Sequence, residues 1–125
     1  MRAVAVILAT VASSATAFAA NGSTALRITL WATPDSSPRV LTLHCDPPRG
    51  TVARPATACA RLERVGRGVF AQTPPGTACT MIYGGPQRAI VAGILDGRKV
   101  WASFRRQDGC EIARWNRVAF LLGTA

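Results

Sequence analysis

The stretch LRITLWATPDSSPRVLTLHC, residues 26–45, decides the fold class, because it holds two strand patterns separated by a turn. Residues 26–31 and 40–45 alternate apolar and polar side chains, which is the period-two pattern of a strand with one buried face. Between them, residues 34–38 (PDSSP) are typical turn residues. We therefore expect two neighbouring antiparallel strands at the start of a sheet.

Three later apolar segments are expected to extend this sheet. Residues 89–95 and 100–104 flank Asp96-Gly97, and an Asp-Gly pair between two β-prone runs is a strong hairpin signal. Two basic residues follow the glycine, so we expect a connection slightly longer than the tightest hairpin. Residues 118–122 (VAFLL) are interpreted as the last strand.

Residues 55–65 form the best helix candidate. Pro55 suits the first turn, where its missing N–H has no intrahelical partner, and Gly66 suits the C-terminal stop. Residues 111–115 are expected to form a short helical turn. The sequence thus predicts an α+β fold in a single domain, residues 20–125, with about five antiparallel strands, two short helices and two disulfides.

Residues 1–19 have the pattern of a secretory signal peptide. A charged start at Arg2 precedes an apolar segment, and Ala17-Phe18-Ala19 provides small residues at the cleavage site. The apolar part is shorter than the roughly 20 residues that a membrane span needs. We expect cleavage after Ala19, with Ala17 as the alternative, and a secreted, extracellular protein without a membrane anchor.

Four cysteines in a short exported chain indicate two disulfides, because the extracellular compartment is oxidising. Three pairings are possible, and spacing alone leaves them open. No C-x-x-C pair is present, so we expect no metal site and no cofactor. The four residues are Cys45, Cys59, Cys79 and Cys110.

The formal net charge of +9 comes almost entirely from arginine. The arginines are dispersed along the chain, whereas a nucleic-acid interface would be clustered, so we interpret them as a solvated surface. Binding of polyanions or of a cell surface is the alternative. Trp31, Trp101 and Trp115 are interpreted as core or dimer-interface residues rather than as platforms for nucleobases, and no nucleic-acid partner is expected.

An enzymatic function has little support in the sequence. His44 is the single histidine and lies in a strand pattern, and neither Glu63 nor Asp46 has a spacing that demands an acid–base pair with it. Hydrolase, metalloprotease and phosphate-binding motifs are absent from the sequence. We therefore expect no catalytic residue.

Residues 78–86 (ACTMIYGGP) suggest a loop held out from the scaffold. A short apolar run follows a cysteine, ends at Gly84-Gly85-Pro86, and comes after the proline-containing segment 72–77. Such a segment, fixed by a disulfide at one end, predicts a rigid extended loop.

Three segments resemble the Streptomyces-type subtilisin inhibitor family: LTLHCDPPRGT at residues 41–51, PATACARL at 55–62 and CTMIY at 79–83. Gly97-Arg-Lys-Val100 and Cys110-Glu111 continue the pattern. The resemblance implies a five-stranded antiparallel sheet with two short helices, a homodimer, and disulfides that join the cysteines in sequential order, Cys45–Cys59 and Cys79–Cys110.

The resemblance also implies a reactive bond, Met81–Ile82, with Met81 as the primary specificity residue and a subtilisin-like or chymotrypsin-like serine protease as the partner. The implied protease-binding loop consists of Cys79, Thr80, Met81, Ile82 and Tyr83. Two positions depart from the family pattern. Gly84-Gly85 stands where the family has one acidic residue, and Asp108 replaces an asparagine that braces the loop. The alternative is an inhibitor fold whose loop is not inhibitory.

Overall fold

Strand β1 (Thr24–Trp31) lies at the centre of a five-stranded antiparallel sheet in the computed structural model, which describes residues 22–123. It pairs with β2 (Arg39–Cys45) on one side and with β4 (Arg88–Leu95) on the other. The edge strands are β3 (Arg49–Gly50) and β5 (Arg98–Phe104), so the order is β3-β2-β1-β4-β5. The predicted pairing of the first two strands is confirmed.

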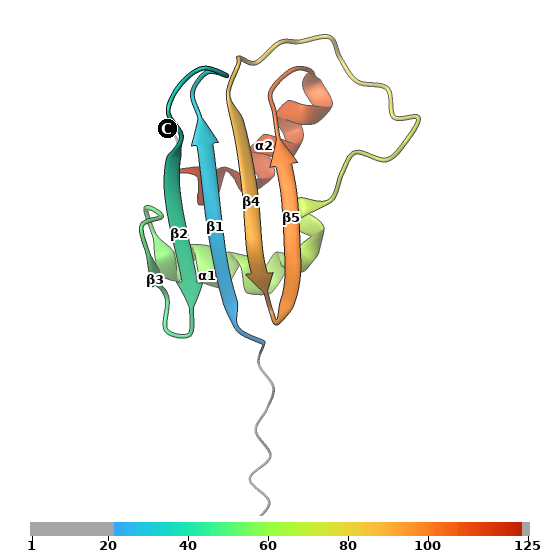
Figure 1. Ribbon diagram of the computed structural model, residues 1–125. Coiled ribbons are helices and arrows are strands. Elements are labelled where there is room, and N and C mark those ends of the chain that lie inside the picture. The colour runs from blue at the N-terminus through green and yellow to red at the C-terminus, as the bar shows by residue number, and fades with distance from the viewer. Residues whose placement is uncertain (1–21, 124–125) are drawn as a thin grey trace, which may run out of the picture.

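One face of the sheet carries the core. Alternate residues of β1, Leu26, Ile28 and Leu30, are buried, as the period-two pattern predicts. The helices α1 (Pro55–Val65) and α2 (Gly109–Leu122) both cover this face, and the opposite face has no helix over it (Figure 1). The apolar side chains between the two layers form one continuous cluster.

Helix α1 has the bounds that the sequence predicts. Pro55 occupies its first turn, and the backbone N–H of Gly66 bonds to the carbonyl of Leu62 at its end. Ala58 and Leu62 are buried against the sheet, and a disulfide joins Cys59 to β2. A short 3₁₀ helix, η1 (Gly66–Phe70), follows directly.

The prediction of a last strand at residues 118–122 is wrong, because this segment belongs to α2. Trp115, Val118 and Leu122 recur at intervals of three and four residues, so all three can be buried on one helical face. The side chain of Asp108 accepts a hydrogen bond from the backbone N–H of Glu111 and caps the helix. Gly123 ends it in the left-handed conformation.

The fifth strand is β3, which pairs with β2 and which the sequence patterns do not reveal. The β4–β5 hairpin also differs from expectation. Leu95 pairs with Arg98, so the turn consists of Asp96 and Gly97 alone. Both residues have positive φ, 50° and 76°, which is what the tightest hairpin turn requires.

The segment predicted as a signal peptide, residues 1–19, lies outside the described residues, so its cleavage after Ala19 stays a prediction. Within residues 22–123, no helix combines the length and the apolar character needed to cross a bilayer.

Candidate reactive loop

The segment between η1 and β4, residues 71–87, leaves the sheet and arches away from it without regular secondary structure (Figure 1, yellow). Near its middle lie three consecutive exposed side chains: Met81 is 93% exposed, Ile82 62% and Tyr83 64%. Burying one large apolar side chain contributes about 1.5–3 kcal/mol. Three in a row left in water indicate a surface that is completed by a partner.

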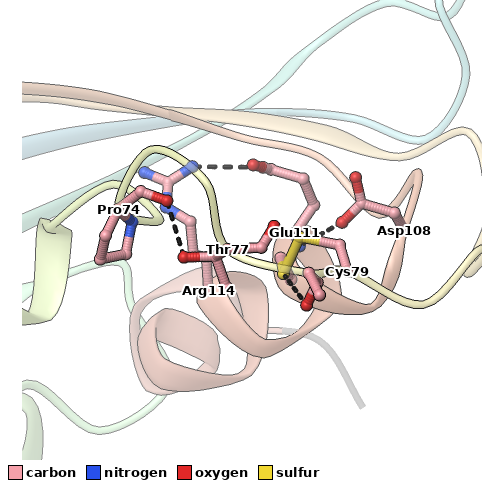
Figure 2. The surroundings of a disulfide bond; sticks show 8 residues. Pro74, Thr77, Cys79, Asp108, Glu111 and Arg114 are labelled. Atoms are coloured by element: carbon pink, nitrogen blue, oxygen red, sulfur yellow. Dashed lines mark hydrogen bonds and ion pairs between the residues drawn. A yellow bond between two sulfur atoms is a disulfide. The ribbon is translucent and has the colours of Figure 1, made fainter.

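The start of this segment is fixed by Arg114 of α2, which is only 5% exposed. Its Nε donates to the carbonyl of Ala71 (3.0 Å), and its Nη1 donates to the carbonyl of Ser103 in β5 (3.1 Å). The carboxylate of Glu111, one turn earlier on α2, pairs with the same Nη1 at 3.2 Å (Figure 2). The guanidinium therefore joins the helix, the sheet and the first residue of the loop.

A tight turn then redirects the chain towards α2. The backbone N–H of Thr77 donates to the carbonyl of Pro74 at 3.3 Å, and the hydroxyl of Thr77 donates to the same carbonyl at 2.7 Å (Figure 2 shows the hydroxyl bond). Gly76 has φ of 79°, a conformation that glycine adopts without strain. Pro75 at the centre of this turn has a fixed φ, which limits the conformations open to the loop, and Gly76 supplies the positive φ that the turn needs.

The N-terminal side of the exposed tripeptide is attached to the start of α2. The disulfide Cys79–Cys110 joins the two segments, with their Cα atoms 5.3 Å apart. The backbone N–H of Gly109 donates to the carbonyl of Thr80 (2.9 Å). A Cβ on Gly109 would overlap the hydroxyl of Thr80, so the absence of a side chain at this position permits the close approach.

The C-terminal side is attached at Gly84. Its backbone N–H donates to the carbonyl of Arg106 (2.7 Å), and its carbonyl accepts from Nε of the same arginine (3.0 Å). Between the fixed residues Thr80 and Gly84, the backbone groups of residues 81–83 make no hydrogen bonds within the described part of the chain. The tripeptide is thus held at both ends while its own donors and acceptors are available to a partner.

The two disulfides of the structure, Cys45–Cys59 and Cys79–Cys110, confirm the sequential pairing that the resemblance implied. The five residues of the expected loop, 79–83, are contiguous and exposed except for the half-buried Cys79. Asp108, which replaces the bracing asparagine of the family, uses its carboxylate to cap α2 (Figure 2).

Three supporting residues, Arg106, Gly109 and Arg114, were not singled out from the sequence. Arg106 bonds to a loop residue 22 positions earlier in the chain, and Arg114 bonds to one 43 positions earlier. No local sequence pattern can therefore identify these two arginines. Arg114 carries a partial signal, because it lies three residues after Glu111 in a capped helix and can form an ion pair with it.

The remaining candidates lie elsewhere. His44 is half-buried on β2 and follows the buried Leu43, so its side chain lies on the open face of the sheet, the face without helices. Glu63 lies on α1, which covers the other face. Trp115 is a core residue, as expected, and Trp101 is 66% exposed.

Within residues 22–123, only one group of potential metal ligands has its ligand atoms close enough together to hold an ion: Cys79, Asp108 and Cys110. Both of its sulfurs are bonded to each other, so the group offers no thiolate to a metal ion.

The fold and the loop together define a class of protein, a small disulfide-bonded domain that presents one exposed segment on a fixed scaffold. The chain belongs to the subtilisin inhibitor-like family, whose model matches residues 20–107. This match confirms the resemblance that the cysteine-containing segments suggested.

Among solved structures, the fold is similar to a chain in the crystal structure of Streptomyces caespitosus sermetstatin in complex with Bacillus licheniformis subtilisin. The two chains are 24% identical, the TM-score is 0.53, and the match covers 83% of this chain and 99% of the other. No curated protein matches the sequence.

Proposed function

We propose that the protein is a secreted inhibitor of subtilisin-like serine proteases, with residues 79–83 as its substrate-like loop and Met81–Ile82 as its reactive bond. One observation carries the proposal: three exposed side chains with free backbone groups lie between two fixed positions, in a member of the subtilisin inhibitor-like family. The structural likeness to sermetstatin, which is described in complex with a subtilisin, supports it.

In this proposal, the loop binds as an added strand. The free backbone groups of residues 81–83 pair with the edge of the protease cleft, in the manner of an extended peptide that joins a sheet. The side chain of Met81 fills the apolar primary pocket, which its 93% exposure allows without any rearrangement of the inhibitor. Its carbonyl carbon then faces the catalytic serine, with the oxygen in the oxyanion hole.

The anchors explain why such a loop would inhibit the protease instead of being consumed as a substrate. Immobilising a flexible side chain on binding costs about 0.5–1.5 kcal/mol, and a loop that is already ordered avoids most of this cost. If the bond is cut, Cys79–Cys110 and the hydrogen bonds at Thr80 and Gly84 hold both new ends. The protein would therefore act on the protease as an inhibitor and not as an enzyme.

Methionine as the primary residue favours subtilisin-like or chymotrypsin-like targets, because trypsin requires a basic side chain in its primary pocket. Titration of subtilisin, chymotrypsin and trypsin with the purified protein tests this directly. We expect stoichiometric loss of subtilisin activity, weaker action on chymotrypsin and none on trypsin. No inhibition of any of the three, or inhibition of trypsin alone, would contradict the proposal.

Export of the protein is part of the proposal. The pattern of residues 1–19 is typical of a signal peptide, and the family match begins at residue 20, which supports cleavage after Ala19. Two disulfides are also typical of an extracellular protein. Amino-terminal sequencing of the secreted product, with Ala20 as the expected first residue, would test the cleavage site.

We also propose a homodimer formed through the open face of the sheet. This face carries the exposed Trp101 and Val40 together with the half-buried Ile90 and Ile94. No helix covers it among the described residues (Figure 1), and exposed apolar side chains on an uncovered sheet face are typical of a protein interface. The reactive loop projects away from the strands, so both copies could bind a protease.

A further inference from the structure

We infer that Arg106 is a positioning residue that holds the C-terminal side of the reactive bond and thereby favours resealing of that bond over release. This inference rests on the proposed function. Gly84 is the third residue after the Met81–Ile82 bond, and Arg106 binds both of its backbone groups. The carbonyl of Arg106 accepts from Gly84 N–H at 2.7 Å, and Nε of Arg106 donates to the Gly84 carbonyl at 3.0 Å.

Arg106 is itself held in place. It lies two residues after the end of β5 and two residues before Asp108, the N-cap of α2, so an ordered element lies close to its backbone on each side. Its guanidinium lies 5.5 Å from the centre of the Trp115 ring, which is 4% exposed. This cation–π contact stabilises the orientation in which Nε donates to the loop.

The surroundings of Gly84 show how closely the loop approaches this support. A Cβ on Gly84 would lie 2.8 Å from Cδ1 of Ile112 and 3.2 Å from Cβ of Arg106. The glycine backbone thus contacts the support directly. The next residue, Gly85, has φ of 126°, which side-chain-bearing residues rarely adopt. Two adjacent glycines would leave this part of the loop mobile without a local restraint.

The two sides of the reactive bond are restrained unequally. On the N-terminal side, the disulfide Cys79–Cys110 and the hydrogen bond from Gly109 to Thr80 both act within two residues of Met81. On the C-terminal side, within the part of the chain that the structure describes, residues 82–85 are held by hydrogen bonds to Arg106 alone. The position of the newly formed amine therefore depends on this arginine.

The position of the Ile82 amine matters because it decides whether the acyl-enzyme is resealed or hydrolysed. Attack of the protease serine on the Met81 carbonyl forms an acyl-enzyme and frees the amino group of Ile82. Attack of this amine on the ester restores the peptide bond and releases the serine, whereas attack of water gives a Met81 carboxylate and the cleaved inhibitor. An amine held near the ester has a high effective concentration, which favours restoration of the peptide bond.

The test compares Arg106→Ala with Arg105→Ala, which removes the same charge from the exposed neighbouring residue. Arg106→Lys is a second variant, because it keeps the charge and the stem but has no N–H at the position of Nε. Each protein is incubated with a catalytic amount of subtilisin, starting from intact and from cleaved inhibitor, until the cleaved-to-intact ratio is constant. Association rates and unfolding midpoints are measured in parallel.

We expect the ratio to rise about tenfold for Arg106→Ala and for Arg106→Lys, as suits the loss of a charge-assisted hydrogen bond, with association rates within about twofold of wild type. Arg105→Ala should match the wild type. Equal ratios for all four proteins would overturn the inference. If Arg106→Ala does not fold, the ratio of Arg106→Lys decides.

A wild-type protein that neither inhibits subtilisin nor is cut at Met81–Ile82 would overturn the proposed function, and the inference with it. This result is distinct from equal ratios among active variants, which would overturn the inference alone. Hydrogen exchange at the Gly84 amide adds a readout without protease. Arg106→Ala keeps the backbone carbonyl that accepts from this amide and removes only the Nε bond to the Gly84 carbonyl, so we expect the loosened loop to exchange faster there, with exchange in β1 unchanged. Uniformly faster exchange would indicate a general loss of stability and would contradict a positioning role.

Discussion

Replacing both cysteines of the Cys79–Cys110 disulfide by serine tests whether inhibition depends on the rigidity of the loop or only on the stability of the domain. The chain offers a matched control in the second disulfide, Cys45–Cys59, which joins β2 to α1 away from the loop. The two bonds close segments with sequence separations of 31 and 14 residues. In the chain-entropy treatment, their removal costs about 3.7 and about 3 kcal/mol of unfolding free energy.

The effects on inhibition should differ far more than the effects on stability. Loss of Cys79–Cys110 frees the N-terminal side of the exposed tripeptide, and three side chains must then be ordered when the protease binds. At about 0.5–1.5 kcal/mol each, the added cost is about 1.5–4.5 kcal/mol, a loss of roughly 10-fold to 2,000-fold in affinity. Loss of Cys45–Cys59 leaves every contact of the loop in place.

The assay is a pair of measurements on each double variant: denaturant unfolding, and the inhibition constant for subtilisin at a temperature where both variants are folded. We expect similar losses of unfolding free energy, and weakened inhibition with rapid cleavage only for the Cys79→Ser/Cys110→Ser variant. Equal inhibition by the two variants would refute the idea that loop rigidity makes the protein an inhibitor.

Three further predictions address single residues. Met81→Lys should shift inhibition from subtilisin to trypsin, with a stability change within about 0.5 kcal/mol because the side chain is 93% exposed; inhibition assays and thermal unfolding check both effects. Asp108→Ala should cost about 1 kcal/mol in denaturant unfolding, because it removes the cap of α2, while Asp108→Asn keeps an accepting side chain and should cost less. An equal loss for both would show that capping is not the role of Asp108. Trp101→Asp should give a monomer by sedimentation with subtilisin inhibition retained, whereas an unchanged dimer would place the interface elsewhere.

Much of the sheet and α1 could be predicted from local patterns. Buried residues alternate with less buried ones in strands β1 and β2, and α1 has its proline start and glycine end. The strand prediction for residues 118–122 is wrong because five consecutive apolar residues are compatible with either a strand or a helix. The helical period appears only when the segment is read together with Trp115 and the Asp108 cap. The family match ends at residue 107, before this helix begins.

The sequence predicts the reactive loop but not the residues that support it. Residues 79–83 are recognisable as a motif, since they follow a cysteine and are contiguous in sequence. Their supports are brought to them only by the fold: Arg106 reaches Gly84 and Arg114 reaches Ala71 from distant positions. Nothing in the sequence distinguishes Arg106 from its neighbour Arg105. The difference arises because the guanidinium of Arg106 lies over the Trp115 ring, whereas Arg105 is exposed.

The central claim is that Met81–Ile82 is the reactive bond of a protease inhibitor. The most direct measurement is mass-spectrometric mapping of the inhibitor after incubation with subtilisin, combined with a residual-activity assay on the same samples. We predict one cut, with Met81 and Ile82 as the new termini, that accumulates slowly while the protease stays inhibited. Cleavage at another bond, or rapid cleavage with full recovery of protease activity, would contradict the claim.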